Sequence, residues 1–119
     1  VTHANPPDDT VRPGTIGLPL PGTDARVVDI ESGLCQVARG EVGELIIRGP
    51  QVMQGYLNDP EETSRMLRNG WLHTGDLGSF DGNGLLTLRD RSKDVVISGG
   101  SNIYPREIEE VLLEHPGVV

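Results

Sequence analysis

The alternation of apolar and polar residues predicts a chain made mainly of short strands. A compact apolar run at Ala25–Asp29 is typical of one strand. The unbroken apolar centre of Glu44–Arg48 indicates a second strand that is buried on both faces. Three further strands are predicted at Trp71–Thr74, Leu85–Arg89 and Val95–Ser98. Residues 1–13 are polar and proline-bearing, so we expect a loop or an early edge strand there.

One helix is predicted over Asn58–Arg68 by its local chemistry. Asp59 suits the N-cap, Pro60 suits the first helical position, and Glu62 has the spacing of a capping box. Gly70 suits the C-terminal cap. The helix is short and mostly polar, so it is expected to lie on the surface.

A second helix is predicted to begin at Pro105, with Ile108, Val111 and Leu112 on one face. Burial of each of these side chains would stabilise the fold by about 1.5–3 kcal/mol. We therefore expect this face to be covered in the complete protein by sequence that follows Val119. If the face and the strand edges are left open, the chain is expected to self-associate.

Turn residues separate these elements, and composition limits the core. The chain has 16 glycines and 9 prolines among 119 residues, which favours many turns and short strands. Asp81-Gly-Asn-Gly84 has the chemistry of a hairpin turn, and Gly14–Gly22 that of a turn-rich connector. Aromatic residues make up only 3%, so the core must be aliphatic and thin.

Charge and cysteine content exclude several functions. A net charge of −8 argues against nucleic acid or an anionic membrane as a partner. The single cysteine, Cys35, excludes an internal disulfide, and a reduced cytoplasm is the default location. The three histidines and the cysteine show no metal-ligand spacing, and no apolar run has membrane-spanning length.

Four segments in series resemble the adenylate-forming superfamily and, within it, the acyl-CoA synthetases (acid–thiol ligases). The segments are GTIGLPLPG at Gly14–Gly22, GELIIRGPQVMQGYLNDPEET at Gly43–Thr63, GWLHTGDLG at Gly70–Gly78 and DRSKDVVISGGSNIYPREIE at Asp90–Glu109. The resemblance implies an α+β chain, mainly β with short helices. Residues 1–91 would form the β-barrel-like end of a large N-terminal domain, a distorted barrel. Residues 92–119 would form the hinge and the start of a small α/β C-terminal domain.

The same resemblance implies an enzyme that joins a small-molecule carboxylic acid to ATP, with Mg²⁺, as an acyl-adenylate. The acyl group then passes to the thiol of coenzyme A. Both ends of the chain resemble internal positions of such an enzyme. The phosphate loop, the acyl pocket and the catalytic lysine of the family are absent from this sequence, so the chain alone is expected to be inactive.

Asp76 and Arg91 are the predicted nucleotide-binding residues. A carboxylate can accept hydrogen bonds from both hydroxyls of a ribose, and a guanidinium can bind a hydroxyl or a phosphate oxygen with fixed geometry. Taken alone, Asp76 would be a turn aspartate and Arg91 a surface cation. The resemblance implies instead that both contact the adenylate.

Four residues further along the chain match the hinge and the thiol channel of the family. Lys93 aligns with the hinge, where an exposed residue can change its backbone angles without breaking packing. Gly99 and Gly100 align with the loop that lines the coenzyme A channel, although a β-turn explains them equally well. Asn102 is the weakest match of this group.

Other polar and aromatic residues are given structural interpretations. Arg89 is expected to be a surface residue, and Trp71 to be a core anchor. Glu109 matches a recurring acid of the family, and a solvated helix face explains it equally well. His73 has no carboxylate partner at a readable spacing, so we interpret it as a packing or capping group. Two alternative identities stay open: an adenylation domain of nonribosomal peptide synthesis, and a non-catalytic β-rich binding module.

Overall fold

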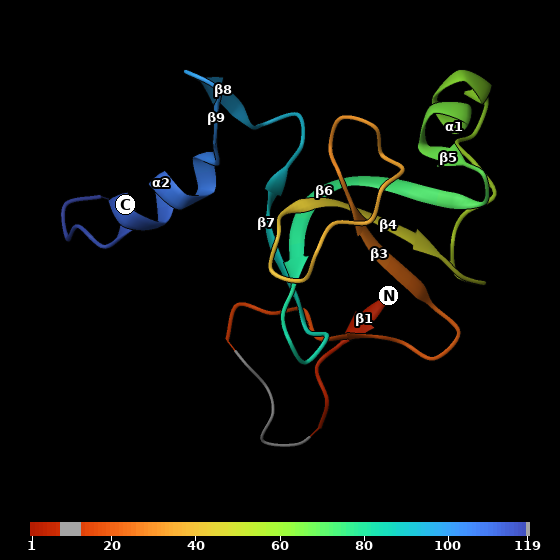
Figure 1. Cartoon of the computed structure of the whole chain (residues 1–119), viewed down its shortest axis with the longest axis horizontal. Coiled ribbons are helices and arrows are strands. Elements are labelled where there is room, and N and C mark those ends of the chain that lie inside the picture. Colours follow the sequence, from red (N-terminus) through yellow and green to blue (C-terminus); the bar gives the residue numbers. More distant parts are fainter. Residues whose placement is uncertain (8–12, 119) are drawn as a thin grey trace.

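The computed structural model describes residues 1–7 and 13–118, which are arranged around one curled antiparallel sheet (Figure 1). The strand order is β3-β4-β6-β5, and β7 also pairs with β6. The five strands are β3 (Asp24–Val28), β4 (Gly43–Arg48), β5 (Leu67–Arg68), β6 (Trp71–Phe80) and β7 (Leu86–Arg91). A mainly β fold with short helices is therefore confirmed.

Two small hairpin-like sheets flank this main sheet. One consists of β1 (His3–Ala4) and β2 (Leu18–Pro19), so residues 1–13 do contain an early strand. The other consists of β8 (Val96–Ser98) and β9 (Ser101–Ile103), and the second strand of this pair was not predicted. Gly99 and Gly100 form the turn between them with φ angles of +59° and +82°. Those left-handed angles explain two consecutive glycines.

The hydrophobic core lies on one face of the main sheet. It comprises Val27 of β3, Leu45 and Ile47 of β4, and Leu86 of β7, all less than 5% exposed. Ile46 points to the opposite face and is also buried, at 5% exposure. The predicted burial of both faces of β4 is therefore confirmed.

Helix α1 (Pro60–Met66) begins as its sequence predicts. The Asp59 side chain accepts a hydrogen bond from the backbone N–H of Glu62 at 2.9 Å, so Asp59 is the N-cap. The predicted C-terminal cap at Gly70 is wrong, because the helix is capped at Leu67 and the chain then enters β5. Asn69 and Gly70, with φ angles of +51° and +79°, instead form the tight turn between β5 and β6.

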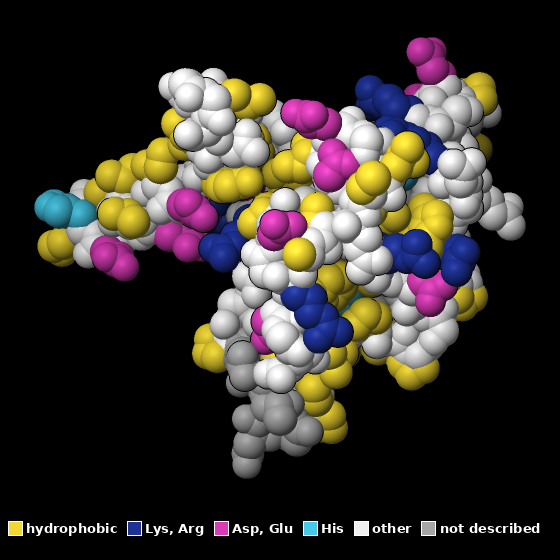
Figure 2. Space-filling model, viewed as in Figure 1, with side chains coloured by type: hydrophobic (Ala, Val, Ile, Leu, Met, Phe, Trp, Pro, Cys, Tyr) yellow, Lys and Arg dark blue, Asp and Glu magenta, His cyan; other side chains and the backbone are white. Residues whose placement is uncertain are grey.

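Helix α2 (Pro105–Leu113) begins at the predicted proline and projects from the sheet with β8 and β9 (Figure 1). Hydrophobic side chains gather along this arm (Figure 2). Ile108, Val111 and Leu112 on it are 52%, 67% and 53% exposed, so nothing in the described chain covers them. Self-association through this face stays a prediction, as does a domain boundary after residue 91.

Candidate functional site

Asp76 and Arg91 lie directly opposite each other on the paired strands β6 and β7. The Arg91 Nε is 3.3 Å from the Asp76 Oδ1. Their side chains are 32% and 64% exposed, so both remain open to solvent. An exposed pair of this kind contributes little stability, and its donors and acceptors are available to a ligand. The structure thus brings together the two residues that the sequence assigns to a nucleotide.

A bulge in β6 determines where Asp76 points. Ile46 pairs with His73 and Glu44 with Leu77, so two steps along β4 correspond to four steps along β6. Gly75 lies within the bulge with a φ of +73°, a conformation that favours glycine. Bulges of this kind re-aim side chains and are common beside active sites.

Hydrogen bonds hold the bulge from both sides. The Thr74 hydroxyl donates to the Leu45 carbonyl at 2.8 Å and accepts from the Asp76 N–H at 3.1 Å. The Ser92 N–H donates to the Gly75 carbonyl at 2.8 Å, which links the bulge to the segment after β7. The backbone of Asp76 is therefore fixed, while its carboxylate, which faces Arg91, stays accessible to solvent.

A buried pair beneath the bulge was missed from the sequence. His73 is 4% exposed, and its Nδ1 lies 2.9 Å from the Glu44 Oε2. The other oxygen of Glu44 accepts a hydrogen bond from the Gly75 N–H at 3.1 Å. The interpretation of His73 as a group without a carboxylate partner is therefore wrong. The two residues are 29 positions apart, a separation that no local spacing rule detects.

Two hollows lie beside this site, and Arg91 lines both of them. The larger has a volume of about 600 Å³ and runs along the bulge and the start of the loop after β7, where Thr74, Gly75, Ser92 and Lys93 line it. The smaller, of about 190 Å³, is lined by Asp76, Leu88, Asp90, Arg91 and Arg106. Arg91 borders both, so a ligand held by Arg91 can reach either one.

Lys93 lies in the loop between β7 and β8 and is exposed. The Asp94 N–H donates to the Arg91 carbonyl at 3.0 Å, which makes this loop a turn. Asn102 of β9 pairs with Ile97 and lines a separate hollow of about 150 Å³ with Leu77 of β6. Asn102 thus lines a hollow that Ser92 of the loop before β8 also lines, whereas Asp76 is not among the residues that line it.

Contacts with α2 hold the C-terminal arm against β7. The Asp90 carboxylate accepts a hydrogen bond from the Arg106 N–H at 3.2 Å. Arg89 lies 3.6 Å from Glu107, so its guanidinium bridges to the helix and is not merely solvated. Asp90 therefore marks a contact between the strand of the candidate site and the first turn of α2.

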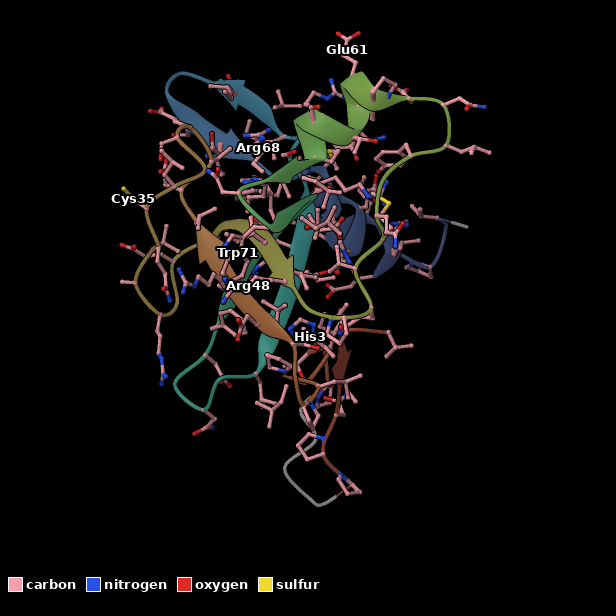
Figure 3. All side chains as sticks on the ribbon, turned by 90° about the vertical axis from the view of Figure 1, so that its right-hand side faces the viewer. His3, Cys35, Arg48, Glu61, Arg68 and Trp71 are labelled. Carbon is pink, nitrogen blue, oxygen red and sulfur yellow. The ribbon has the colours of Figure 1, made fainter. Side chains whose placement is uncertain are left out.

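Trp71 is not the core anchor that the sequence predicts. Its ring is only partly buried, with the guanidinium carbons of Arg26 and Arg48 each 4.7 Å from the ring centroid. The ring is thus held by cation–π contacts on the face of the sheet opposite the core. Arg48 and Trp71 lie close together in Figure 3, with Arg68 above them.

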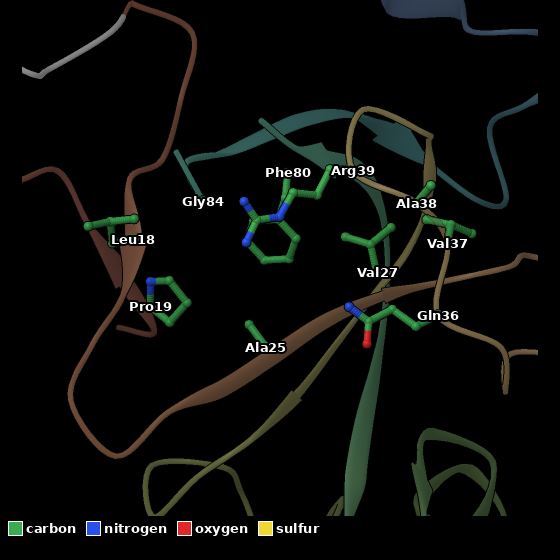
Figure 4. A pocket seen from close by; sticks show the side chains of 10 residues that line it. All are labelled: Leu18, Pro19, Ala25, Val27, Gln36, Val37, Ala38, Arg39, Phe80 and Gly84. Atoms are coloured by element: carbon green, nitrogen blue, oxygen red, sulfur yellow. The ribbon is translucent and has the colours of Figure 1, made fainter. Parts of the chain in front are cut away.

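A further hollow of about 330 Å³ lies between β2, β3 and the segment before β4 (Figure 4). Leu18, Ala25, Val27 and Phe80 line it, and Arg39 is the one charged residue in the part of its lining that the structure describes. It contains none of the predicted site residues.

Residues 1–7 and 13–118 include no group of three or more His, Cys, Asp or Glu side chains arranged to hold a metal ion. Neither helix in this part of the chain has the length and apolar character of a membrane span.

The chain is similar to AMP-binding enzymes in sequence and in fold. Residues 1–57 match the AMP-binding enzyme family. The crystal structure of ATP-bound MatB from Rhodopseudomonas palustris superposes with a TM-score of 0.91 at 44% identity. That match covers 99% of this chain and 24% of MatB.

Within that class, the chain is similar to acyl-CoA ligases. A long-chain-fatty-acid–CoA ligase of Bacillus subtilis (strain 168) is 52% identical over 118 residues, which are 99% of this chain and 21% of that enzyme. A 2-succinylbenzoate–CoA ligase of Bacillus mycoides (strain KBAB4) is 49% identical over 106 residues, or 89% of this chain and 21% of that enzyme. The chain thus spans about a fifth of the length of these relatives.

Proposed function

We propose that this chain is part of an ATP-dependent acid–thiol ligase, an acyl-CoA synthetase that forms an acyl-adenylate and then a thioester with coenzyme A. The observation that carries the proposal is the cross-strand pairing of Asp76 with Arg91 at a bulge, in a chain whose relatives are named as CoA ligases. A relative solved with ATP bound supports ATP as the nucleotide.

In this proposal, Asp76 and Arg91 hold the nucleotide. The Asp76 carboxylate accepts hydrogen bonds from the ribose hydroxyls, and the Arg91 guanidinium donates to a ribose or phosphate oxygen. The bulge fixes the Asp76 backbone, so the ligand meets a preorganised acceptor. Mg²⁺ would accompany the phosphates of ATP, and the proposal assigns no metal ligand to the described residues.

Asp76→Asn in the full-length protein tests this role. The substitution keeps the size of the side chain and removes its charge and one of its acceptors. Loss of a charge-assisted hydrogen bond, about 1.5–3 kcal/mol, is expected to raise the KM for ATP by about 10- to 100-fold. Asp24→Asn is the matched control. Asp24 is also an exposed carboxylate that pairs with an arginine, Arg48, but it belongs to β3, which is separated from β6 by β4. Equal KM values for the two variants would contradict the assignment.

Lys93 is proposed as the hinge between the adenylate-forming and the thioester-forming arrangement. Lys93→Pro fixes φ at this position and is expected to block the change between the two. Formation of the acyl-adenylate, followed as pyrophosphate release, should persist while transfer to coenzyme A slows strongly. A variant that loses or retains both half-reactions together would refute the hinge.

Gly99, Gly100 and Asn102 are proposed to line the path of the coenzyme A thiol. Gly100→Ala is expected to slow thioester formation more than adenylate formation. Gly70→Ala is a closely matched control, because both glycines lie in hairpin turns with a φ near +80° and open space around the Cβ position. If both variants slow the thioester step equally, the effect is one of backbone strain and the channel assignment is wrong.

A further inference from the structure

The face of the sheet opposite the core carries a groove rich in arginine. Strand register places Arg26, Ile46 and His73 in one row across β3, β4 and β6, and Arg68 beside Trp71 at the next position. A hollow of about 240 Å³ lies over these rows. We call it the arginine groove; it is lined by Arg26, Val28, Gly33, Leu34, Gln36, Ile46, Arg68, Asn69, Trp71 and His73.

Among the described residues, the two guanidinium groups that line the groove have no acidic partner, whereas His73, which also lines it, pairs with Glu44. None of the described residues that line it is Asp or Glu, although the chain has 18 acidic residues and a net charge of −8. Arg48, at its edge, is neutralised by Asp24 at 2.6 Å. Arg26 contacts the Trp71 ring, and the Arg68 Nε donates to the Arg65 carbonyl at 2.6 Å. Within residues 1–7 and 13–118, neither Arg26 nor Arg68 forms an ion pair with a carboxylate.

A hydrogen-bonded loop closes one side of the groove. The Asp29 carboxylate accepts from the N–H groups of Glu31 and Ser32, both at 2.9 Å, and the Asp29 carbonyl accepts from Gly33 at 2.9 Å. Gly33 is buried with a φ of +64°. A Cβ on Gly33 would lie 3.2 Å from the His73 ring and 3.8 Å from the Arg68 guanidinium. The loop therefore packs directly onto the residues of the groove and shapes it.

Arg26 and Arg68 line the same groove, so an anion bound there would be attracted by two positive charges. Arginine binds phosphate oxygens with paired donors, and the amides of Gln36 and Asn69 supply further N–H groups in the same hollow. The volume of about 240 Å³ is below the range of about 300–1,000 Å³ that holds drug-sized ligands, so the occupant must be small. We propose that the arginine groove is a binding site for a small phosphate-bearing anion, held by Arg26 and Arg68.

The single tryptophan of the chain provides a direct probe, because Trp71 contacts Arg26 and lines the groove. The intact protein is labelled with 5-fluorotryptophan, and the resonance that is missing from Trp71→Phe is assigned to this residue. Inorganic phosphate and, separately, glycerol 3-phosphate are titrated at constant ionic strength set with sodium chloride. The Trp71 resonance is expected to shift and saturate with at least one of them. Saturation by both indicates a site for free phosphate, and saturation by glycerol 3-phosphate alone indicates a site for phosphomonoesters.

Charge-matched variants locate the site. Arg26→Gln and Arg68→Gln are each expected to raise the half-saturating concentration by at least about tenfold, since each removes a charged hydrogen-bond donor. Arg39→Gln removes the same charge from a residue outside the groove, whose Nη1 donates to the Gly82 carbonyl at 2.9 Å, and should leave the titration unchanged. A wild-type resonance that does not saturate with either phosphate overturns the proposal, and so does an equal effect of all three variants. Both results are independent of the nucleotide assignment of Asp76.

Discussion

The carboxylate of Glu44 is the structural support of the β6 bulge, and its removal gives the sharpest test of that role. Glu44→Ala deletes the partner of the His73 Nδ1 at 2.9 Å and of the Gly75 N–H at 3.1 Å. The Glu44 side chain is 16% exposed and that of His73 5% exposed, so water reaches the vacated positions poorly. A buried polar group left without a partner costs about 1–3 kcal/mol. For the two groups together we expect the free energy of unfolding to fall by about 2–4 kcal/mol.

Glu44→Gln should have an intermediate effect. The glutamine oxygen can still accept from the Gly75 N–H, but its NH₂ group suits the His73 Nδ1 only when that nitrogen carries no proton. We expect a loss of about 1–2 kcal/mol for this variant. Glu31→Ala is the control, because Glu31 is an exposed residue of the 29–36 loop and should change stability by less than about 0.5 kcal/mol.

Urea denaturation gives the free energies, and amide hydrogen exchange at Gly75 reports on the bulge itself. The Gly75 amide should exchange faster in Glu44→Ala than in the wild type. Amides in β3 should exchange at an unchanged rate. If Glu44→Ala and Glu31→Ala unfold at the same urea concentration, the two hydrogen bonds of Glu44 contribute nothing and the reasoning fails. Under the proposed function, Glu44→Ala should also raise the KM for ATP, since Asp76 follows directly after Gly75.

Three further outcomes follow from single features of the fold. Burial lowers the pKa of His3 from its ordinary 6.5, so at falling pH the unfolded chain takes up a proton at His3 before the folded chain does. The stability of the fold should therefore fall as the pH drops from about 6.5 toward that lowered pKa. Thermal melts at several pH values should show a smaller fall in His3→Gln. Asp59→Ala removes the α1 N-cap and should cost about 0.5–2 kcal/mol in urea denaturation, whereas an unchanged midpoint would contradict the capping role. Leu86→Ala creates a cavity at a side chain with 0% exposure and should lower the free energy of unfolding by about 2–5 kcal/mol in the same assay. A decrease of less than about 1 kcal/mol would count against a packed core at this position.

Several elements of this protein are determined by residues within or next to the element itself. The Asp59 cap and Pro60 at the start of α1, and Pro105 at the start of α2, act within one helical turn, so the sequence predicts each of them correctly. The apolar centre of β4 predicts burial on both of its faces for the same reason, because side chains alternate along a strand. Resemblance added Asp76 and Arg91, which the fold then places opposite each other.

Only the tertiary structure decided which distant groups meet. Gly70 has the chemistry of a helix cap and of a hairpin turn, and the pairing of β5 with β6 selects the turn. Glu44 and His73 come together because the register of β4 and β6, with its bulge, places them there. The same register gathers Arg26, Arg68 and Trp71 on one face. Sequence spacing determines contacts within one turn or one strand, whereas strand pairing, which depends on the whole sheet, determines the contacts that make a site.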